Sequence, residues 1–346
     1  MCRVYRHGLS ANLLRQNKVR TMLYQKFRPH SSSNPLSLRL RPRFRAVCQV
    51  LKSLFLFPRT GALLTAVLVN LTLLAGDVPF STEYTYAPPL DEISGIAVSR
   101  KNTDVLWIHN DSGDQNRIYA INSQGNYLGA YYIDDVSSRD WEDIAVGPGP
   151  IDSEHYIYIG DIGDNQAEYD FKYIYRVREP YVDFNQSPLV STISDVEVIK
   201  FQYPDGKRDA ETLMVDPLTK DIYIVSKRES NVRVYRAPYP QATNSTITLE
   251  HVATLNLDGQ TVGGDISPSG LGILLKTYSS IYYWCRMSGQ KLWQTFKNKP
   301  VTVPYTIEPQ GEAVGWMSNG LGYYTISEEP DGNPAHLYFY PIMILK

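Results

Sequence analysis

Pairs of acidic residues recur along the chain at the start of short apolar runs, and their side chains suit the binding of a divalent cation. Glu142, Glu211 and Glu312 occupy equivalent places in three such runs, and Asp140 and Asp209 lie two residues before the first two glutamates. Side chains two residues apart on a strand point the same way, so each pair faces one side. Carboxylate oxygens are the ligands that calcium and magnesium prefer, and no Cys/His cluster favours zinc. The pattern predicts a calcium site, with magnesium as the alternative.

Further polar residues follow the second apolar run of each repeat. If that run pairs antiparallel with the first, its end returns to the side where the first run begins. We expect Asp111 and Asp161 to join the five acids above as metal ligands, and Glu142 or Asp161 to act as general base. The residues expected to hold an anionic ligand at this end are Lys227, Arg228, Lys276, Asn110 and Asn165.

The same acids also have a structural interpretation. Asp and Glu at strand starts accept hydrogen bonds from loop amides, and the turns NDSGD (110–114) and GDIGDN (160–165) have the composition of ordinary tight turns. Asp143 and Asp216 are expected to point away from the site and to be structural. His109 is expected to pack at a strand end rather than to act as a base.

The repeated runs indicate how these residues are positioned. Five heads recur roughly every 50 residues, which is typical of one structural unit repeated along the chain. The heads are ISGIAV (93–98), WEDIAVGP (141–148), DAETLMVDP (209–217), GGDISP (263–268) and QGEAVGW (310–316). Aromatic and β-branched runs follow each head, separated by Gly, Asn and Asp turns. The sequence predicts an all-β fold, a single β-propeller of five four-stranded blades over residues 77–346.

The remaining strands of each blade are expected in chain order. They are 105–109, 117–122 and 127–133 in blade 1; 156–160, 173–177 and 196–203 in blade 2; 221–226, 232–236 and 251–257 in blade 3; 272–277, 281–285 and 293–296 with 301–303 in blade 4; and 322–327 and 336–340 in blade 5. A polar insert lies around 183–194. Residues 81–86 are expected to supply the missing fourth strand of blade 5, which would close the ring and remove the exposed sheet edge. No amphipathic helix is expected after residue 77.

The first 76 residues differ sharply from the rest. They carry 13 Lys and Arg and no acid, which leaves 21 basic and 36 acidic residues beyond them. Phosphate groups would be repelled by so acidic a domain, so nucleic acid is excluded as a partner. Residues 1–59 are interpreted as a disordered basic leader. The uncharged apolar run in 60–76 is interpreted as a signal-peptide h-region or a signal anchor, with a mitochondrial transit peptide as a third alternative.

The first two alternatives place the acidic domain outside the cytosol. The protein would then be secreted, or anchored as a type II membrane protein if the apolar segment is not cleaved. The sequon Asn244-Ser245-Thr246 is compatible with a glycoprotein. Cys285 is the one cysteine beyond the leader, so a disulfide framework within the propeller is excluded. We expect a monomer.

Several motifs together resemble a family of secreted, largely uncharacterised β-propeller proteins of bacteria and some invertebrates. They are HNDSGD (109–114) with RIYAIN (117–122), RDWEDIA (139–145), GDIGDN (160–165), DAE (209–211) and QGEA (310–313). More distantly, the chain is similar to phytase-like esterase propellers and to five-bladed calcium-activated nucleotidases. That likeness implies calcium in an acidic central channel. The motifs differ from those of the nucleotidases throughout, so it implies no preference for nucleotides.

Two classes of function follow. The first is a calcium-dependent hydrolase of phosphoesters or other anionic esters. The second is a non-catalytic extracellular propeller that binds a glycan or protein, with calcium in a purely structural role. Fold does not discriminate between them. Mixed charge gathered in a channel favours the enzyme, because active sites are where such charges are brought together.

Overall fold

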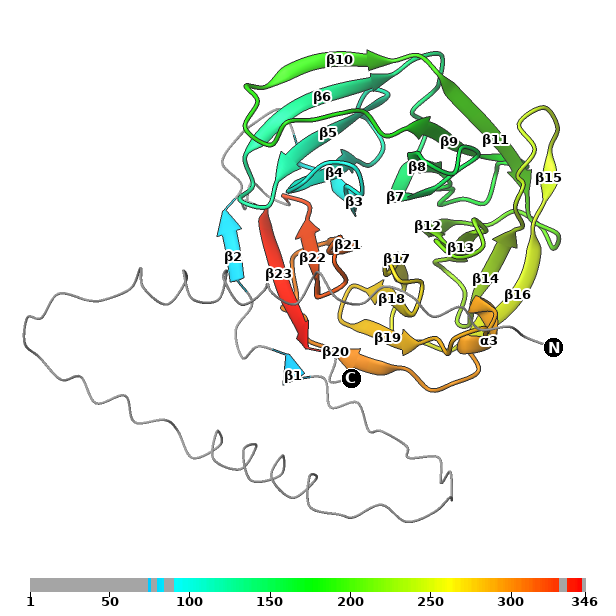
Figure 1. Cartoon of the computed structure of the whole chain (residues 1–346). Helices are drawn as coiled ribbons and strands as arrows, with labels where there is room; N and C mark the ends of the chain where they lie inside the picture. Colours follow the sequence, from blue (N-terminus) through cyan, green and yellow to red (C-terminus); the bar gives the residue numbers. More distant parts are fainter. Residues whose placement is uncertain (1–73, 76–79, 84–89, 330–334, 344–346) are drawn as a thin grey trace, which may run out of the picture. The chain divides into compact units, whose positions relative to one another are not determined.

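The computed structural model describes residues 74–75, 80–83, 90–329 and 335–343, which form strands β1 to β23 and one short helix, α3. The strands make five small sheets that surround a common centre (Figure 1). The innermost strands are β3, β7, β12, β17 and β21, and each contacts the innermost strands of the two neighbouring sheets. The predicted all-β fold, a five-bladed propeller, is confirmed.

Each blade is an antiparallel sheet whose strands follow one another outwards from the centre. Blade 1 contains β3 (Ile93–Val98), β4 (Val105–Asn110), β5 (Arg117–Asn122) and β6 (Tyr127–Ile133). Blade 2 contains β7 (Trp141–Pro148), β8 (His155–Asp161), β9 (Lys172–Arg178) and β11 (Val196–Gln202). Blade 3 contains β12 (Ala210–Val215), β13 (Ile222–Ser226), β14 (Val232–Ala237) and β16 (Glu250–Leu255). Blade 4 contains β17 (Thr261–Ile266), β18 (Gly272–Thr277), β19 (Ile281–Cys285) and β20 (Val301–Val303).

Blade 5 is completed by the N-terminal part of the propeller. Its strands β21 (Gly311–Trp316), β22 (Gly322–Ser327) and β23 (His336–Met343) come from the end of the chain. Strand β2 (Phe80–Glu83) pairs antiparallel with β23, with Phe80 opposite Phe339. The predicted ring closure is therefore present, although residues 84–86 of the expected strand lie outside the described residues. A further two-residue strand, β1 (Leu74–Ala75), pairs with Ile342 and Met343.

Besides β1 on blade 5, two further blades carry a fifth strand that the sequence did not predict. Strand β10 (Leu189–Ile193), within the expected polar insert, runs parallel to β6 on the outer edge of blade 1. Strand β15 (Ile247–Thr248) runs parallel to β11 on blade 2. In both cases the segment between the third and fourth strands of one blade covers the outer edge of the preceding blade. The outermost strand is thereby protected from pairing with other chains.

The expected strand at 293–296 is wrong. Residues Leu292–Thr295 form helix α3 instead, between β19 and β20. The side chains of Leu292 and Phe296 are buried among residues of blades 3 and 4, such as Val234 and Ile273. Apolar residues in this segment fill space between two blades, and that purpose does not require an extended backbone.

The core lies in the spaces between neighbouring blades. Trp107 of blade 1 and Trp141 of blade 2 are both fully buried in one cluster with Ile144 and Val146. Asp143 also joins two blades: its carboxylate accepts hydrogen bonds from the amides of Ile144, at 2.9 Å, and Leu213, at 2.8 Å. These contacts suit the structural role that the sequence predicted for Asp143.

A bulge recurs at the same place in all five innermost strands. Strand pairing skips one residue near the start of each, for example between Trp141 and Asp143 in β7 and between Ala210 and Thr212 in β12. A β-bulge leaves the extra residue unpaired and re-aims its side chain. The skipped residues are Ser94, Glu142, Glu211, Val262 and Glu312.

Most of the N-terminal expectations fall on residues that the structure does not describe. The basic leader and all of the apolar segment 60–76 except residues 74 and 75 are among them. Within the described ranges, no helix has the length and hydrophobicity needed to cross a membrane. The sequon residue Asn244 is exposed, in a bend before β15.

Candidate functional site

Three of the five bulged residues are glutamates, and the structure brings them together. One carboxylate oxygen each of Glu142, Glu211 and Glu312 lies within 4.8 Å of the others, and all three side chains are buried. We call these residues the inner group. Their equivalent positions in the repeat had predicted that they share one level of the propeller.

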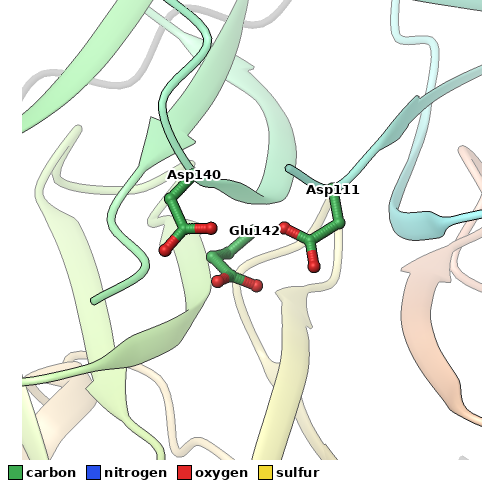
Figure 2. Close-up of side chains that lie close together, drawn as sticks. All are labelled: Asp111, Asp140 and Glu142. Atoms are coloured by element: carbon green, nitrogen blue, oxygen red, sulfur yellow. The ribbon is translucent and has the colours of Figure 1, made fainter. Parts of the chain in front are cut away.

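A second set of carboxylates shares Glu142 with the inner group. Asp111 follows β4, Asp140 precedes β7, and one oxygen from each lies within 4.8 Å of the others and of a Glu142 oxygen (Figure 2). We call Asp111, Asp140 and Glu142 the outer group, since its two aspartates are partly exposed. Calcium binds oxygens at about 2.3–2.6 Å, so two of its ligands lie at most about 5 Å apart. Both groups satisfy that limit.

The outer group has no ion-paired cation within the described part of the chain, although the charges of Arg139 and Lys172 act to lower the pKa of Asp140. None of its three carboxylates forms an ion pair there, although Asp111 accepts a hydrogen bond of 2.5 Å from the amide of Ser112. The backbone of Gly163 lies directly against it: a Cβ atom at this position would collide with Glu142 Oε1 and Asp140 Oδ2. The second glycine of the GDIGDN turn therefore keeps the space beside these oxygens open.

Burial and mutual repulsion disfavour negative charge in this cluster. Burial first, and then the charges of neighbouring carboxylates including Asp140, raises the pKa of Asp111 to about 7, although the hydrogen bond from the Ser112 amide acts in the opposite direction. Burial first, and then the charges of Glu211, Asp111 and Asp140, raises the pKa of Glu142 well above its usual range. The pKa of Asp140 is raised in the same direction, chiefly by burial. Such a cluster needs protons or a cation for neutralisation.

The inner group already contains one cation. Lys227, at the end of blade 3, donates a hydrogen bond to Glu211 Oε1, and its Nζ lies 3.8 Å from Glu312 Oε1. Its ammonium group also donates to the Tyr278 hydroxyl at 3.1 Å, and that hydroxyl donates to Glu312 Oε1 at 2.5 Å. The sequence predicted Lys227 as a ligand for an anion, whereas the structure places it among carboxylates. Despite burial, the charges of Glu211 and Glu312 raise its pKa above the usual value.

Asp161 and Asp209, also predicted as metal ligands, belong to neither group. Asp161 accepts from the Asp140 amide at 3.2 Å and from the Tyr175 hydroxyl at 3.1 Å, so both of its oxygens are engaged. Asp209 accepts from the Asp164 amide at 2.8 Å and from Arg228 Nε at 2.6 Å. Both acids therefore hold the loops around the outer group in place.

The predicted anion-binding residues are dispersed. Arg228 has a side chain that is 43% exposed, and it donates to Asp209 and to the side-chain oxygen of Asn165. Lys276 is fully buried and donates to the Gly311 carbonyl and, at 2.8 Å, to the Tyr305 hydroxyl. Burial lowers its pKa to about 8.

Two more predicted residues lie at the end of β4. The Asn110 side chain donates to Asp114 at 3.2 Å. His109 is buried, with its Nδ1 at 2.8 Å from the Asn110 carbonyl and its ring against Trp141. Burial lowers the pKa of His109 to about 4, as suits the packing residue that the sequence predicted.

The sequence did not single out Glu328, which follows β22, as a catalytic or metal-binding residue. Its pKa is raised to about 7 by burial and then by the charges of Glu312, Asp111 and Glu92. Its carboxylate accepts a hydrogen bond of 2.5 Å from the Gln310 side chain. Its place directly after the second strand of its blade, equivalent to Asp111 in blade 1, is the signal that could have identified it.

We predict that the metal-free protein loses stability as the pH rises from about 4 to about 7. Because the folded state raises the pKa of Asp111 to about 7, it holds that proton more tightly than the unfolded chain does. Stability from this group is therefore present at low pH and lost as Asp111 ionises. Melting temperatures measured in chelator should fall across this range, and Asp111→Asn should flatten the decline. An identical pH profile in wild type and variant would contradict the prediction.

No protein-family model matches the chain, and no curated protein sequence is similar to it. Among solved structures, a luciferin-regenerating enzyme is 12% identical with a TM-score of 0.42, over 78% of this chain and 98% of that one. Hydrazine synthase of Kuenenia stuttgartiensis is 12% identical with a TM-score of 0.39, over 73% of this chain and 96% of that one. Neither likeness reaches beyond a distant similarity of fold, and the family suggested by the motifs stays a prediction.

Proposed function

We propose that the protein holds a calcium ion on Asp111, Asp140 and Glu142 and hydrolyses an anionic ester of the phosphoester type at this mouth of the propeller. One observation carries the proposal: three carboxylates meet within 4.8 Å and lack an ion-paired cation in the described ranges. The space kept open by Gly163 beside two of their oxygens supports it. All donors are hard oxygens, which favours calcium or magnesium over softer metals.

The residues around the outer group suit an anionic ester. A bound calcium ion would supply charge to polarise an ester oxygen and to increase the acidity of water. Arg228 and Asn165, already in contact with each other, offer hydrogen-bond donors to an anionic group. Glu328 is the better candidate for general base than Asp161, since a carboxylate with a pKa near 7 can accept a proton from water at neutral pH.

The test is hydrolysis of phosphomonoesters and phosphodiesters by the metal-free protein, before and after addition of calcium. We expect hydrolysis that depends on calcium, and a loss of at least about 100-fold in Asp140→Asn, because one ligand of the ion is removed. Glu308→Gln is the matched control: Glu308 is also a buried glutamate but belongs to neither group. Hydrolysis that persists in chelator, or that is lost equally in Glu308→Gln, would overturn the proposal.

A second function is favoured by a specific observation. Asp161 was expected to act as a base and Lys276 to bind the anion, but the polar atoms of both side chains form hydrogen bonds within the protein. A non-catalytic propeller that binds a glycan or protein at the same mouth, with a structural cation, needs neither residue. Calcium binding without hydrolysis of any ester would favour this alternative.

A further inference from the structure

The inner group keeps one polar atom without a partner. Glu211 is 3% exposed, and Lys227 donates to its Oε1. Its other oxygen, Oε2, is buried and has no hydrogen-bond partner in the described part of the molecule. A buried carboxylate oxygen left in this state costs free energy comparable to a lost hydrogen bond to a charged group. The atom thus points to a missing ligand of the inner group.

The charges of the two groups lead to the same conclusion. Three other acids near the mouth have their own cations: Asp161 pairs with Arg139, Asp164 with Lys172 and Asp209 with Arg228. The outer and inner groups together hold five carboxylates and a single ammonium, that of Lys227. Four negative charges therefore remain when all five acids are ionised. One calcium ion on the outer group neutralises half of them.

We propose that the inner group binds a second calcium ion, through Glu211 Oε2 and oxygens of Glu142 and Glu312, so that Glu142 is shared by two ions. This inference rests on the proposed function, because it takes the outer group to hold the first ion. Two divalent cations neutralise the four remaining charges. Two-metal sites place their ions about 3.5–4 Å apart, which a shared carboxylate permits. Lys227 remains hydrogen-bonded to Glu211 Oε1, and its positive charge neutralises the fifth carboxylate of the two groups.

The burial of the inner group determines which divalent cation it can bind. All three glutamates of the inner group are buried, so a cation there must lose most of its water. Magnesium gives up water reluctantly and demands octahedral geometry, whereas calcium accepts flexible arrangements of carboxylate oxygens. The inner site is therefore specific for calcium, while the partly exposed outer group accepts either ion.

Calorimetric titration of the full-length, metal-free protein with calcium alone tests the inference. We expect two equivalents in the wild type and one in Glu211→Gln. Asp111→Asn should instead weaken the outer site by about 10-fold or more while one tight equivalent persists, since mutation of a ligand lowers affinity strongly. Glu308→Gln is the control, because Glu308 also carries a buried oxygen without a partner yet lies outside both groups. It should retain two equivalents.

Two further variants keep the test decisive if Glu211→Gln does not fold. Glu312→Gln should also leave one equivalent, and Lys227→Met should keep two with the inner affinity raised at least about 10-fold by loss of a like charge. One equivalent in the wild type, unchanged by Glu211→Gln or Glu312→Gln, would overturn the second ion and leave the proposed function standing. An absence of calcium binding in the wild type would overturn both.

Discussion

Replacing Glu142 by glutamine is expected to weaken calcium binding at both groups by at least about 100-fold while making the metal-free protein more stable. Glu142 is the one residue that the outer and inner groups share. Burial and four neighbouring carboxylates raise its pKa, so its ionised form is disfavoured in the empty site. The neutral amide removes that repulsion. The metal-free variant is therefore expected to be more stable than the metal-free wild type at pH 8, where the buried carboxylate would otherwise have to ionise.

The stabilisation that calcium provides should decrease in Glu142→Gln, whereas the stability of the metal-free protein should increase. A ligand present at 100 times its dissociation constant stabilises the native state by about 2.7 kcal/mol. For a domain of this size, that corresponds to a rise in melting temperature of roughly 5–10 °C. We expect this rise in the wild type and its loss in Glu142→Gln. Differential scanning calorimetry at pH 8, in chelator and in excess calcium, measures both quantities.

Glu308→Gln again provides the control, because it removes a buried carboxylate whose pKa is also raised, to about 7, outside both groups. It should keep the calcium response in full. If Glu142→Gln instead lowers the melting temperature in chelator and keeps the calcium response, Glu142 is a structural residue. The cation site, and with it the hydrolase, would then be excluded.

The fold could be predicted because the sequence patterns that define its strands and turns are short and recur in every blade. Each head combines turn residues with an apolar run, and the alternation that follows defines strands without knowledge of distant partners. The closure of the ring by β2 could be predicted because the sequence places only three strands in blade 5, so a fourth had to come from the N-terminal side of the propeller. The bulges were not predicted, yet they explain why Glu142, Glu211 and Glu312 share one level.

The additional strands β10 and β15 could not be predicted in the same way. Residue Leu189 pairs with Gly129, which precedes it by 60 positions, and the segment 189–193 is largely exposed. An exposed strand at the edge of a sheet carries little hydrophobic pattern. Its assignment depends on which blade presents a free edge, and that is a property of the assembled propeller.

The composition of the site was predictable, but its division into two groups was not. Position in the repeat identifies which acids face the centre. It does not reveal that Lys227 bonds to Glu211, or that Tyr175 and the Asp140 amide occupy both oxygens of Asp161. These partners come from other strands and loops, and they decide which carboxylates remain free to bind a ligand.

Asp216→Asn should produce a stability change opposite in sign to that of Glu142→Gln. Asp216 lies in the turn after β12, and both of its oxygens accept hydrogen bonds of 2.9 Å from Arg286, which follows β19. The pair joins blades 3 and 4, and both side chains are buried. Removing one partner of a buried pair leaves the other charge uncompensated, at a cost of about 3–5 kcal/mol. The melting temperature should fall on the order of 10 °C.

Urea unfolding of Asp216→Asn, Arg286→Met and the double variant measures this coupling. The double variant should be less destabilised than the sum of the single variants, because it leaves no unpaired charge. The calcium response should be unchanged in all three, since Asp216 lies at the opposite end of β12 from Glu211. A loss of stability below about 0.5 kcal/mol would contradict the structural role of Asp216. Opposite signs for Asp216→Asn and Glu142→Gln would separate acids that stabilise the propeller from acids whose repulsion a cation must relieve.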